Sequence, residues 1–248
     1  MDPRRPTWPA VAERRRFLRE AARGAMWGGA ALVLTACAPP AKTADHPRGE
    51  DKKESEEEGA EVTPGEDLMQ EHGLLERVLL IYEAAADRVE RAEALEPGIV
   101  VDAATIIRSF VEDYHEKQEE DFVFPALARS AEHGPLVETL REQHRRGRRA
   151  TDEILRIARA GGAEQAALAP QLRAFVRMYR PHAAREETVL LPAFRRTLDD
   201  SGYRELGEKF EDREHALFGE GGFEDVVKRA GAIEAALGID DLARFTVA

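Results

Sequence analysis

The sequence predicts an all-α protein: an up-down-up-down four-helix bundle with additional C-terminal helices. Apolar residues recur at spacings of three and four along four consecutive segments, which is the period of one buried helix face. Short breaks that contain Gly or Pro separate the segments, and such short connections favour antiparallel neighbours. No alternating pattern typical of a β-strand is comparably strong.

The first 37 residues predict an export signal that ends at a lipid-modified cysteine. Arg14-Arg15-Arg16 fits a twin-arginine (Tat) signal, and the 13 apolar residues from Gly24 to Ala36 fall short of the roughly 20 that span a membrane. Leu34 to Cys37 resembles a lipobox, in which the cysteine becomes the lipid-bearing N-terminus. We therefore expect an exported, extracytoplasmic lipoprotein that Cys37 anchors to the membrane, on the periplasmic side where a cell has two membranes.

Residues 38–62 predict a disordered acidic tether, because dense charge and few apolar residues cannot offset the entropy lost on ordering. The whole chain has a formal net charge of −12, and residues 1–36 carry seven arginines and three acidic residues, so the processed chain would carry −16. Such a charge disfavours phosphate backbones, and we expect no nucleic-acid partner. The sequence leaves the oligomeric state open.

Residues 63–199 form the predicted bundle, and residues 200–248 a helical extension. Thr63 begins the first helix, with Pro in the next position and Glu three residues later, as in a capping box. The predicted buried face of this helix contains Leu68, His72, Leu75, Leu79, Tyr82, Ala86 and Val89. The second helix, from about Val101 to Ser130, is predicted to bury Val111, His115, Glu119, Phe122 and Ala126.

The third and fourth helices follow the breaks at His133-Gly134-Pro135 and Gly161-Gly162. The third is predicted to bury Val137, Leu140, His144, Gly147, Thr151, Ile154 and Ala158. The fourth is predicted to bury Leu168, Leu172, Phe175, Tyr179, His182, Glu186, Val189 and Ala193. Apolar positions in the extension predict two more helices, which bury Leu206, Phe210, Leu217, Phe223, Val227, Ala230, Ile233 and Leu237.

Ionisable residues occupy six of these core positions, and burying them is costly unless something binds them. They are His72, His115, Glu119, His144, His182 and Glu186. His-x3-Glu places both side chains on one helix face, one turn apart. The motif with Pro six residues after Glu occurs twice, at His115 and at His182, and each copy follows a helix with one core histidine. Two such half-sites predict a dinuclear metal centre, whereas any single residue could be a core histidine bonded to a carboxylate.

On these motifs, residues 66–198 resemble a hemerythrin-like (HHE cation-binding) domain. The resemblance implies a cofactor of two iron ions with a bridging oxygen species. It implies that the four histidines are terminal ligands and that Glu119 and Glu186 bridge the irons. Imidazole and carboxylate donors suit iron, and zinc or manganese could also bind such a set.

The sequence departs from the oxygen-carrying hemerythrins at one expected ligand. These carriers have a second histidine one turn after the third-helix ligand, where this chain has Arg148, so reversible oxygen transport is not implied. The carriers also space the fourth-helix His and Asp by five residues, unlike His182 and Glu186. Glu116, next to His115, is the first substitute for the absent histidine, and His215 is the second. Glu76 and Glu187 are expected to be solvated.

Three functions remain open at this stage. The leading one is a membrane-tethered non-haem di-iron protein that binds dioxygen or a related small oxidant for sensing, delivery or protection. The second is a di-iron enzyme that acts on peroxide, nitric oxide or ferrous ion. The third is a metal-free structural lipoprotein. The Glu-x2-His motif of ferritin-like oxidases has the opposite order and a different spacing, which disfavours that rival fold.

Overall fold

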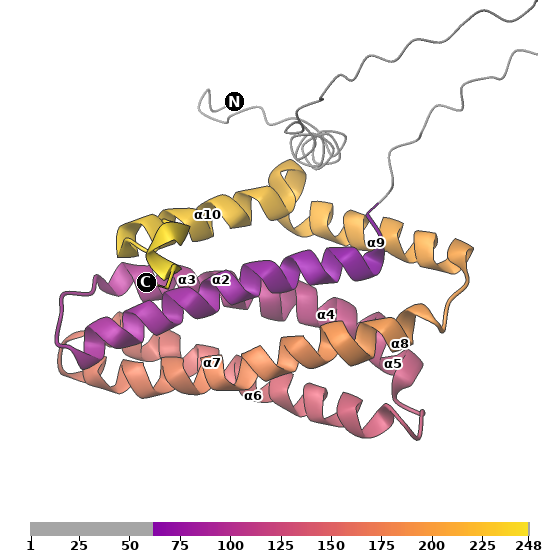
Figure 1. The fold of residues 1–248 in the computed structure, drawn as a ribbon, viewed down its shortest axis with the longest axis horizontal. Coiled ribbons are helices and arrows are strands. Elements are labelled where there is room, and N and C mark those ends of the chain that lie inside the picture. Colours follow the sequence, from indigo (N-terminus) through magenta and orange to yellow (C-terminus); the bar gives the residue numbers. More distant parts are fainter. Residues whose placement is uncertain (1–61, 248) are drawn as a thin grey trace, which may run out of the picture. The chain divides into compact units, whose positions relative to one another are not determined.

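A computed structural model describes residues 62–247, and the predicted signal, the lipidated Cys37 and the tether up to residue 61 lie outside the described residues. Within the described range the chain is helical and contains no strand, which confirms the predicted all-α class. Four long helical rods run up, down, up and down, and two further helices pack beside them (Figure 1). No helix among residues 62–247 is both long enough and apolar enough to cross a membrane.

The first rod is α2 (Pro64–Glu90), and it begins at the predicted capping box. The Thr63 hydroxyl accepts from the amide of Glu66, and the Glu66 carboxylate accepts from the amide of Thr63 at 2.9 Å. These reciprocal bonds satisfy amides that have no partner inside the helix. The helix buries Leu68, His72, Leu75, Leu79 and Tyr82, as predicted, and packs mainly against the fourth rod.

The second rod is one continuous helix whose hydrogen bonding changes along its length. It consists of α3 (Pro97–Ile106), the π-helical η1 (Ile107–His115), α4 (Glu116–Gln118), the π-helical η2 (Glu119–Val123) and α5 (Phe124–Leu127). Both histidine and glutamate of the first His-x3-Glu motif lie in π-helical segments. Such segments are rare and occur frequently at functional sites.

The third rod is α6 (Gly134–Ala160), which a 3-10 turn, η3 (Gly162–Ala167), joins to the fourth. The fourth rod consists of α7 (Leu168–Arg185), the π-helical η4 (Glu186–Leu190) and α8 (Leu191–Arg195). The fourth rod changes its hydrogen bonding at the same place as the second rod. In each, a π-helical segment begins at the glutamate of the His-x3-Glu motif: η2 at Glu119 and η4 at Glu186. The two rods that carry this motif are therefore built alike.

The π-turns explain two wrong predictions about the core. The amide of Phe124 bonds to the carbonyl of Glu119 five residues earlier. Each such turn contains one residue more than an α-helical turn, so the side chains that follow it point in a different direction around the rod. Ala126, predicted to be buried, is exposed, and Val189 is 37 % exposed. The faces that follow the π-turns instead bury Val123, Phe124, Leu127, Leu190, Leu191 and Phe194.

Proline accounts for the position of two of the three π-helical segments in the described part of the chain, η2 and η4. Pro125 stands two residues after the end of η2, and Pro192 stands two residues after the end of η4. A proline has no amide hydrogen, and its ring collides with the carbonyl four residues earlier in a regular α-helix. A wider turn directly upstream relieves this collision without breaking the rod.

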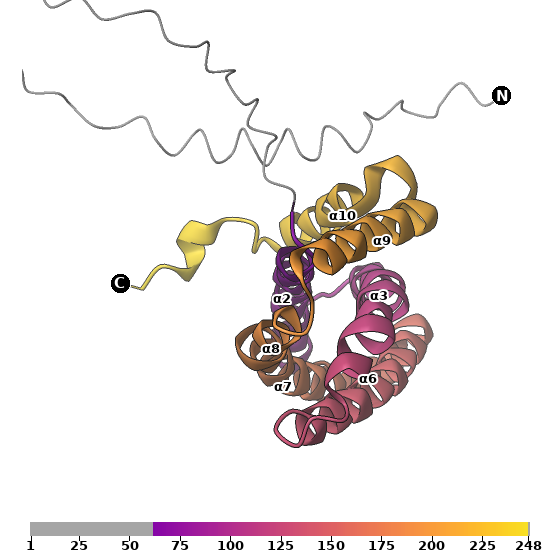
Figure 2. The ribbon, with the colours of Figure 1, turned by 90° about the vertical axis from the view of Figure 1, so that its right-hand side faces the viewer.

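The C-terminal extension contains α9 (Asp200–Phe218), the short 3-10 turns η5 (Gly219–Gly221) and η6 (Leu242–Phe245), and α10 (Gly222–Leu237). Viewed along the rods, α9 and α10 lie outside the bundle, over α2 and the second rod (Figure 2). They bury Leu206, Phe210, Ala230, Ile233 and Leu237, as predicted. Leu217 was predicted to be buried but is 55 % exposed, because Phe218 provides the contacts with Phe110 and Tyr114.

Candidate metal centre

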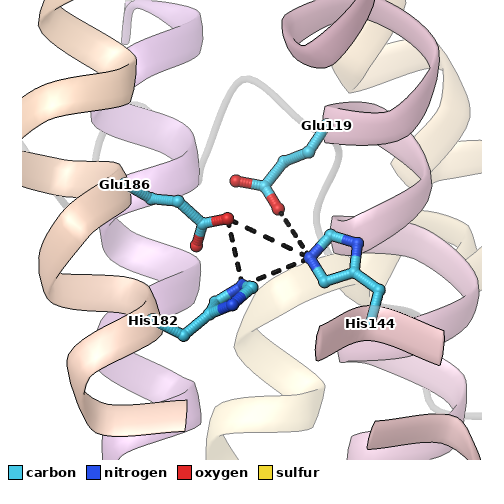
Figure 3. A group of neighbouring side chains, drawn as sticks. All are labelled: Glu119, His144, His182 and Glu186. Carbon is cyan, nitrogen blue, oxygen red and sulfur yellow. Dashed lines mark hydrogen bonds and ion pairs between the residues drawn. The ribbon is translucent and has the colours of Figure 1, made fainter. Parts of the chain in front are cut away.

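The six predicted ligand residues converge in the interior, midway between the four rods. All six are buried, and none is more than 4 % exposed. In the half that Figure 3 shows, the Nε2 atoms of His144 and His182 lie 3.2 Å apart. The Glu119 carboxylate lies 3.5 Å from His144 Nε2, and the Glu186 carboxylate lies 3.0 Å from His182 Nε2.

The other half of the centre belongs to His72 and His115, whose ring centroids are 4.8 Å apart. His72 Nε2 lies 3.3 Å from Glu186, and His115 Nε2 lies 3.7 Å from Glu119. Each carboxylate therefore borders one imidazole from each half. Glu119 and Glu186 thus connect the two halves of the centre.

The Nδ1 atom of each histidine points away from the centre toward a polar side chain. His115 Nδ1 lies 2.6 Å from Glu71, and His182 Nδ1 lies 2.8 Å from the Gln143 amide oxygen. His144 Nδ1 lies 3.2 Å from Glu120, and His72 Nδ1 lies 3.3 Å from Glu187. Such partners orient metal-binding imidazoles and leave Nε2 free for the ion.

These four partners repeat the two-fold symmetry of the ligands. Glu71 and Gln143 precede the histidine of their own helix and contact the histidine of the next rod. Glu120 and Glu187 directly follow the two central glutamates. Sequence reasoning missed the four residues and expected Glu187 to be solvated. The doubled acidic pairs Glu119-Glu120 and Glu186-Glu187 were the signal that could have identified two of them.

The buried polar atoms at the centre fit a metal cluster. Both carboxylate oxygens of Glu119 and of Glu186, and the nitrogens of His72, have no hydrogen-bond partner. Leaving such groups unsatisfied in the interior is costly. One oxygen or nitrogen atom from each of Glu119, His144, His182 and Glu186 lies within 4.8 Å of the others, and the same holds for His72, His115 and Glu119. Glu119 belongs to both groups, as a bridging ligand would.

Burial and neighbouring charges shift the pKa values of these groups away from their usual ranges. Burial and the nearby Glu186 carboxylate raise the pKa of Glu119 well above its usual range. Burial has the same tendency at Glu186, but the neighbouring His182 and His72 outweigh it and hold its pKa well below the usual range. Burial and the neighbouring His182 lower the pKa of His144 to about 4. A cation at the centre would favour the deprotonated form of every ligand.

Glu116 and His215, the two candidate ligands in place of the absent histidine, lie away from the centre. Glu116 stands behind His144: its carboxylate accepts from the Tyr179 hydroxyl at 2.6 Å, pairs with Arg148 at 2.8 Å and lies 3.9 Å from His144 Nδ1. His215 is exposed on α9. Arg148 also pairs with Glu120, so it links two buried or partly buried carboxylates at the position where the oxygen carriers have an imidazole.

Comparison with known families agrees with this geometry. The family model described as hemerythrin HHE cation-binding domain matches residues 63–194, which is more than half of the chain. The chain belongs to the hemerythrin HHE cation-binding domain family. The matched segment contains all but the last residue of the four rods and all six residues of the centre, whereas α9 and α10 of the extension lie outside it.

The HHE domain protein also has close relatives in mycobacteria. Uncharacterized proteins of Mycobacterium bovis and of two strains of Mycobacterium tuberculosis are each 40% identical to it over 246 residues. These alignments cover 97% of this chain and 93% of each relative, so the likeness extends well beyond the HHE domain. No solved structure matches the chain.

Proposed function

We propose that this chain is a non-haem di-iron protein that binds dioxygen or a related small oxidant. The observation that carries the proposal is the position of Glu119 and Glu186, each between imidazoles of both halves. His72 and His115 would hold one ion, His144 and His182 the other, and the two carboxylates would join them. When bound, an iron pair would supply one electron from each ferrous ion to a small oxidant.

This ligand set is small enough to leave room for a further molecule. Two imidazoles and two shared carboxylates give each ion four protein ligands, fewer than the six of octahedral coordination. Arg148, engaged with Glu116 and Glu120, supplies no donor in place of the absent histidine. Near the centre, a surface hollow of about 520 Å³ is lined in part by Gln143, the partner of His182, and by Met178.

A metal count with optical spectroscopy tests the proposal. We expect two irons per chain in untagged protein and near-ultraviolet absorption typical of an oxygen-bridged ferric pair. His115→Ala should lose iron, and His215→Ala, which alters an exposed histidine, should retain it. Absence of stoichiometric metal together with unchanged thermal stability of His115→Ala would overturn the proposal in favour of a metal-free structural protein.

The same open coordination positions also support an enzyme that acts on peroxide, nitric oxide or ferrous ion. Mixing the reduced protein with each substrate in a stopped-flow instrument separates the two functions. A lasting spectral change on exposure to oxygen supports binding, whereas rapid turnover of a substrate supports catalysis. The buried ligands favour binding, because burial limits the access of water and protons to the centre.

We further propose that the protein is exported and tethered to the membrane by lipid on Cys37. The twin-arginine pattern, the short apolar stretch and the lipobox support this location. The alignments with the mycobacterial relatives cover 97% of the chain, so they extend into this N-terminal region. The full chain should partition into detergent, and Cys37→Ala should partition into water. Equal partitioning of both proteins would contradict the tether.

A further inference from the structure

A second group of buried acidic residues lies between α2 and α9. Asp67 and Glu71 come from α2 and Glu214 from α9, and each is at most 6 % exposed. One carboxylate oxygen from each residue lies within 4.8 Å of the other two. The Tyr114 hydroxyl lies 3.4 Å from Glu214. Three carboxylates this close repel one another in the interior. The Phe223 amide donates to Glu214 at 2.8 Å, and His115 Nδ1 lies 2.6 Å from Glu71. A bound cation would offset the repulsion further.

Gln118 supplies an independent observation, because it is fully buried and neither its amide oxygen nor its amide nitrogen has a hydrogen-bond partner. Glu116 and Glu120 stand two residues to either side of it and contact residues of α6 and α7. Two residues turn a helix by about 200°. Gln118 therefore faces the opposite side of the rod, where α2 and α9 pack.

The register between α9 and the second rod places Gln118 opposite Glu214. The Tyr114 ring contacts Phe218 and the Phe122 ring contacts Phe210, with centroid distances of 5.4 and 5.7 Å. Gln118 stands four residues from Tyr114 and from Phe122, and Glu214 stands four residues from each phenylalanine. This register brings the unbonded amide to the side of the rod that faces Glu214 of the acidic group.

We propose that Asp67, Glu71, Glu214 and Gln118 form a second cation site, which binds one hard divalent cation such as Ca²⁺ through oxygen atoms alone. Three carboxylate oxygens at this spacing, with an amide oxygen on the facing rod, suit such a cation, which prefers oxygen ligands at about 2.3–2.6 Å. The site is separate from the histidine centre, although Glu71 also holds His115 Nδ1. Glu214 lies outside the matched HHE segment, so the C-terminal extension completes the site.

Calorimetric titration of the full, iron-loaded chain with Ca²⁺ tests the site. We expect one Ca²⁺ per chain, and we expect Glu214→Gln to weaken its binding by roughly tenfold or more, because it removes one ligand charge. Glu208→Gln makes the same chemical change at an exposed position of α9 and should leave the affinity unchanged. If the wild-type chain binds no Ca²⁺, the carboxylates share protons instead and the proposal fails.

Two more variants keep the test decisive. Gln118→Leu fills the same space without an amide oxygen, so it should weaken Ca²⁺ binding. It tests the site even if Glu214→Gln does not fold. Unchanged Ca²⁺ affinity of Gln118→Leu would show that Gln118 is not a ligand. His182→Ala should bind Ca²⁺ normally while it loses iron. This separates the site from the proposed di-iron function, because Ca²⁺ disfavours imidazole ligands. Loss of Ca²⁺ binding in His182→Ala would show that the histidine centre, and not the acidic group, binds Ca²⁺.

Discussion

The hydroxyl of Tyr179 occupies the space that a β-carbon at Gly147 would fill. This close approach between α7 and α6 brings the hydroxyl to 2.6 Å from the Glu116 carboxylate, and the Tyr179 ring packs 5.3 Å from that of His182. The glycine is therefore part of the support of the metal centre, because its missing side chain lets the tyrosine reach the buried carboxylate.

Gly147→Ala should destabilise the protein by about 1–3 kcal/mol, because the added methyl group collides with Tyr179 in a packed interior. Gly73→Ala is the matched control: a β-carbon there meets nothing within 4 Å. It should stabilise α2 by about 0.5–1 kcal/mol through helix propensity. Urea unfolding of both variants measures the difference. Equal changes in the free energy of unfolding would show that the Tyr179 side chain moves aside without a measurable cost.

Arg148→Leu should destabilise the fold by about 3 kcal/mol, because it leaves the buried Glu116 without its cation. Burial raises the pKa of Glu116 to about 8 even with Arg148 and the Tyr179 hydroxyl opposing that shift. Arg149→Leu alters a neighbouring, exposed arginine and should have little effect. Thermal unfolding at about pH 9, where a carboxyl group with this pKa is mostly charged, compares the two. A small effect of Arg148→Leu would mean that Glu116 is already protonated.

Gln143→Leu should lower the affinity for iron by about 10- to 100-fold, because the loss of its amide oxygen releases Nδ1 of His182. Glu138→Gln, in the same surface hollow but without a contact to the centre, should retain wild-type affinity. Competition with a chelator measures both affinities. If Gln143→Leu keeps full affinity, packing alone orients the His182 ring.

The metal-free protein should lose stability as the pH rises through about 9. Burial opposes the charged form of His72, but Glu186 and Glu187 outweigh burial and raise its pKa to about 9. Because the folded value exceeds the unfolded value of about 6.5, this contribution is complete below about pH 6.5 and disappears above about pH 9. Melting temperatures of apo protein over this range test it. His72→Gln should remove the dependence, and a persisting slope would assign it to another group.

The sequence contained enough information to predict the bundle and to place its six ionisable core residues together. Periodicity identifies a buried position whatever its chemistry, so His72, His115, His144 and His182 could be read from the same pattern as their leucine neighbours. The prolines and the doubled motif indicated that the second and fourth rods are alike. These features are local, and a single sequence reports local features well.

The sequence could not reveal features that depend on tertiary contacts or on local changes of helix pitch. Ala126 and Val189 were misplaced because a period of 3.6 residues does not hold across a π-turn. Glu71 and Gln143 were missed as partners because each contacts a histidine of another rod, at a distance in sequence that no helix period predicts. Glu116 was expected as a possible ligand, and only the packing of Tyr179 and Arg148 shows that it is held behind His144.

The outward hydrogen bonds of three histidines, His115, His144 and His182, also fix where each ring carries its proton. A carboxylate or amide oxygen beside Nδ1 selects the tautomer with hydrogen on Nδ1, which leaves the lone pair of Nε2 directed inward. His144, with its pKa near 4, is neutral in this form at physiological pH. These three rings are thus preorganised, and an arriving ion needs no rotation of them before it binds, whereas His72, whose pKa is raised to about 9, must first lose a proton.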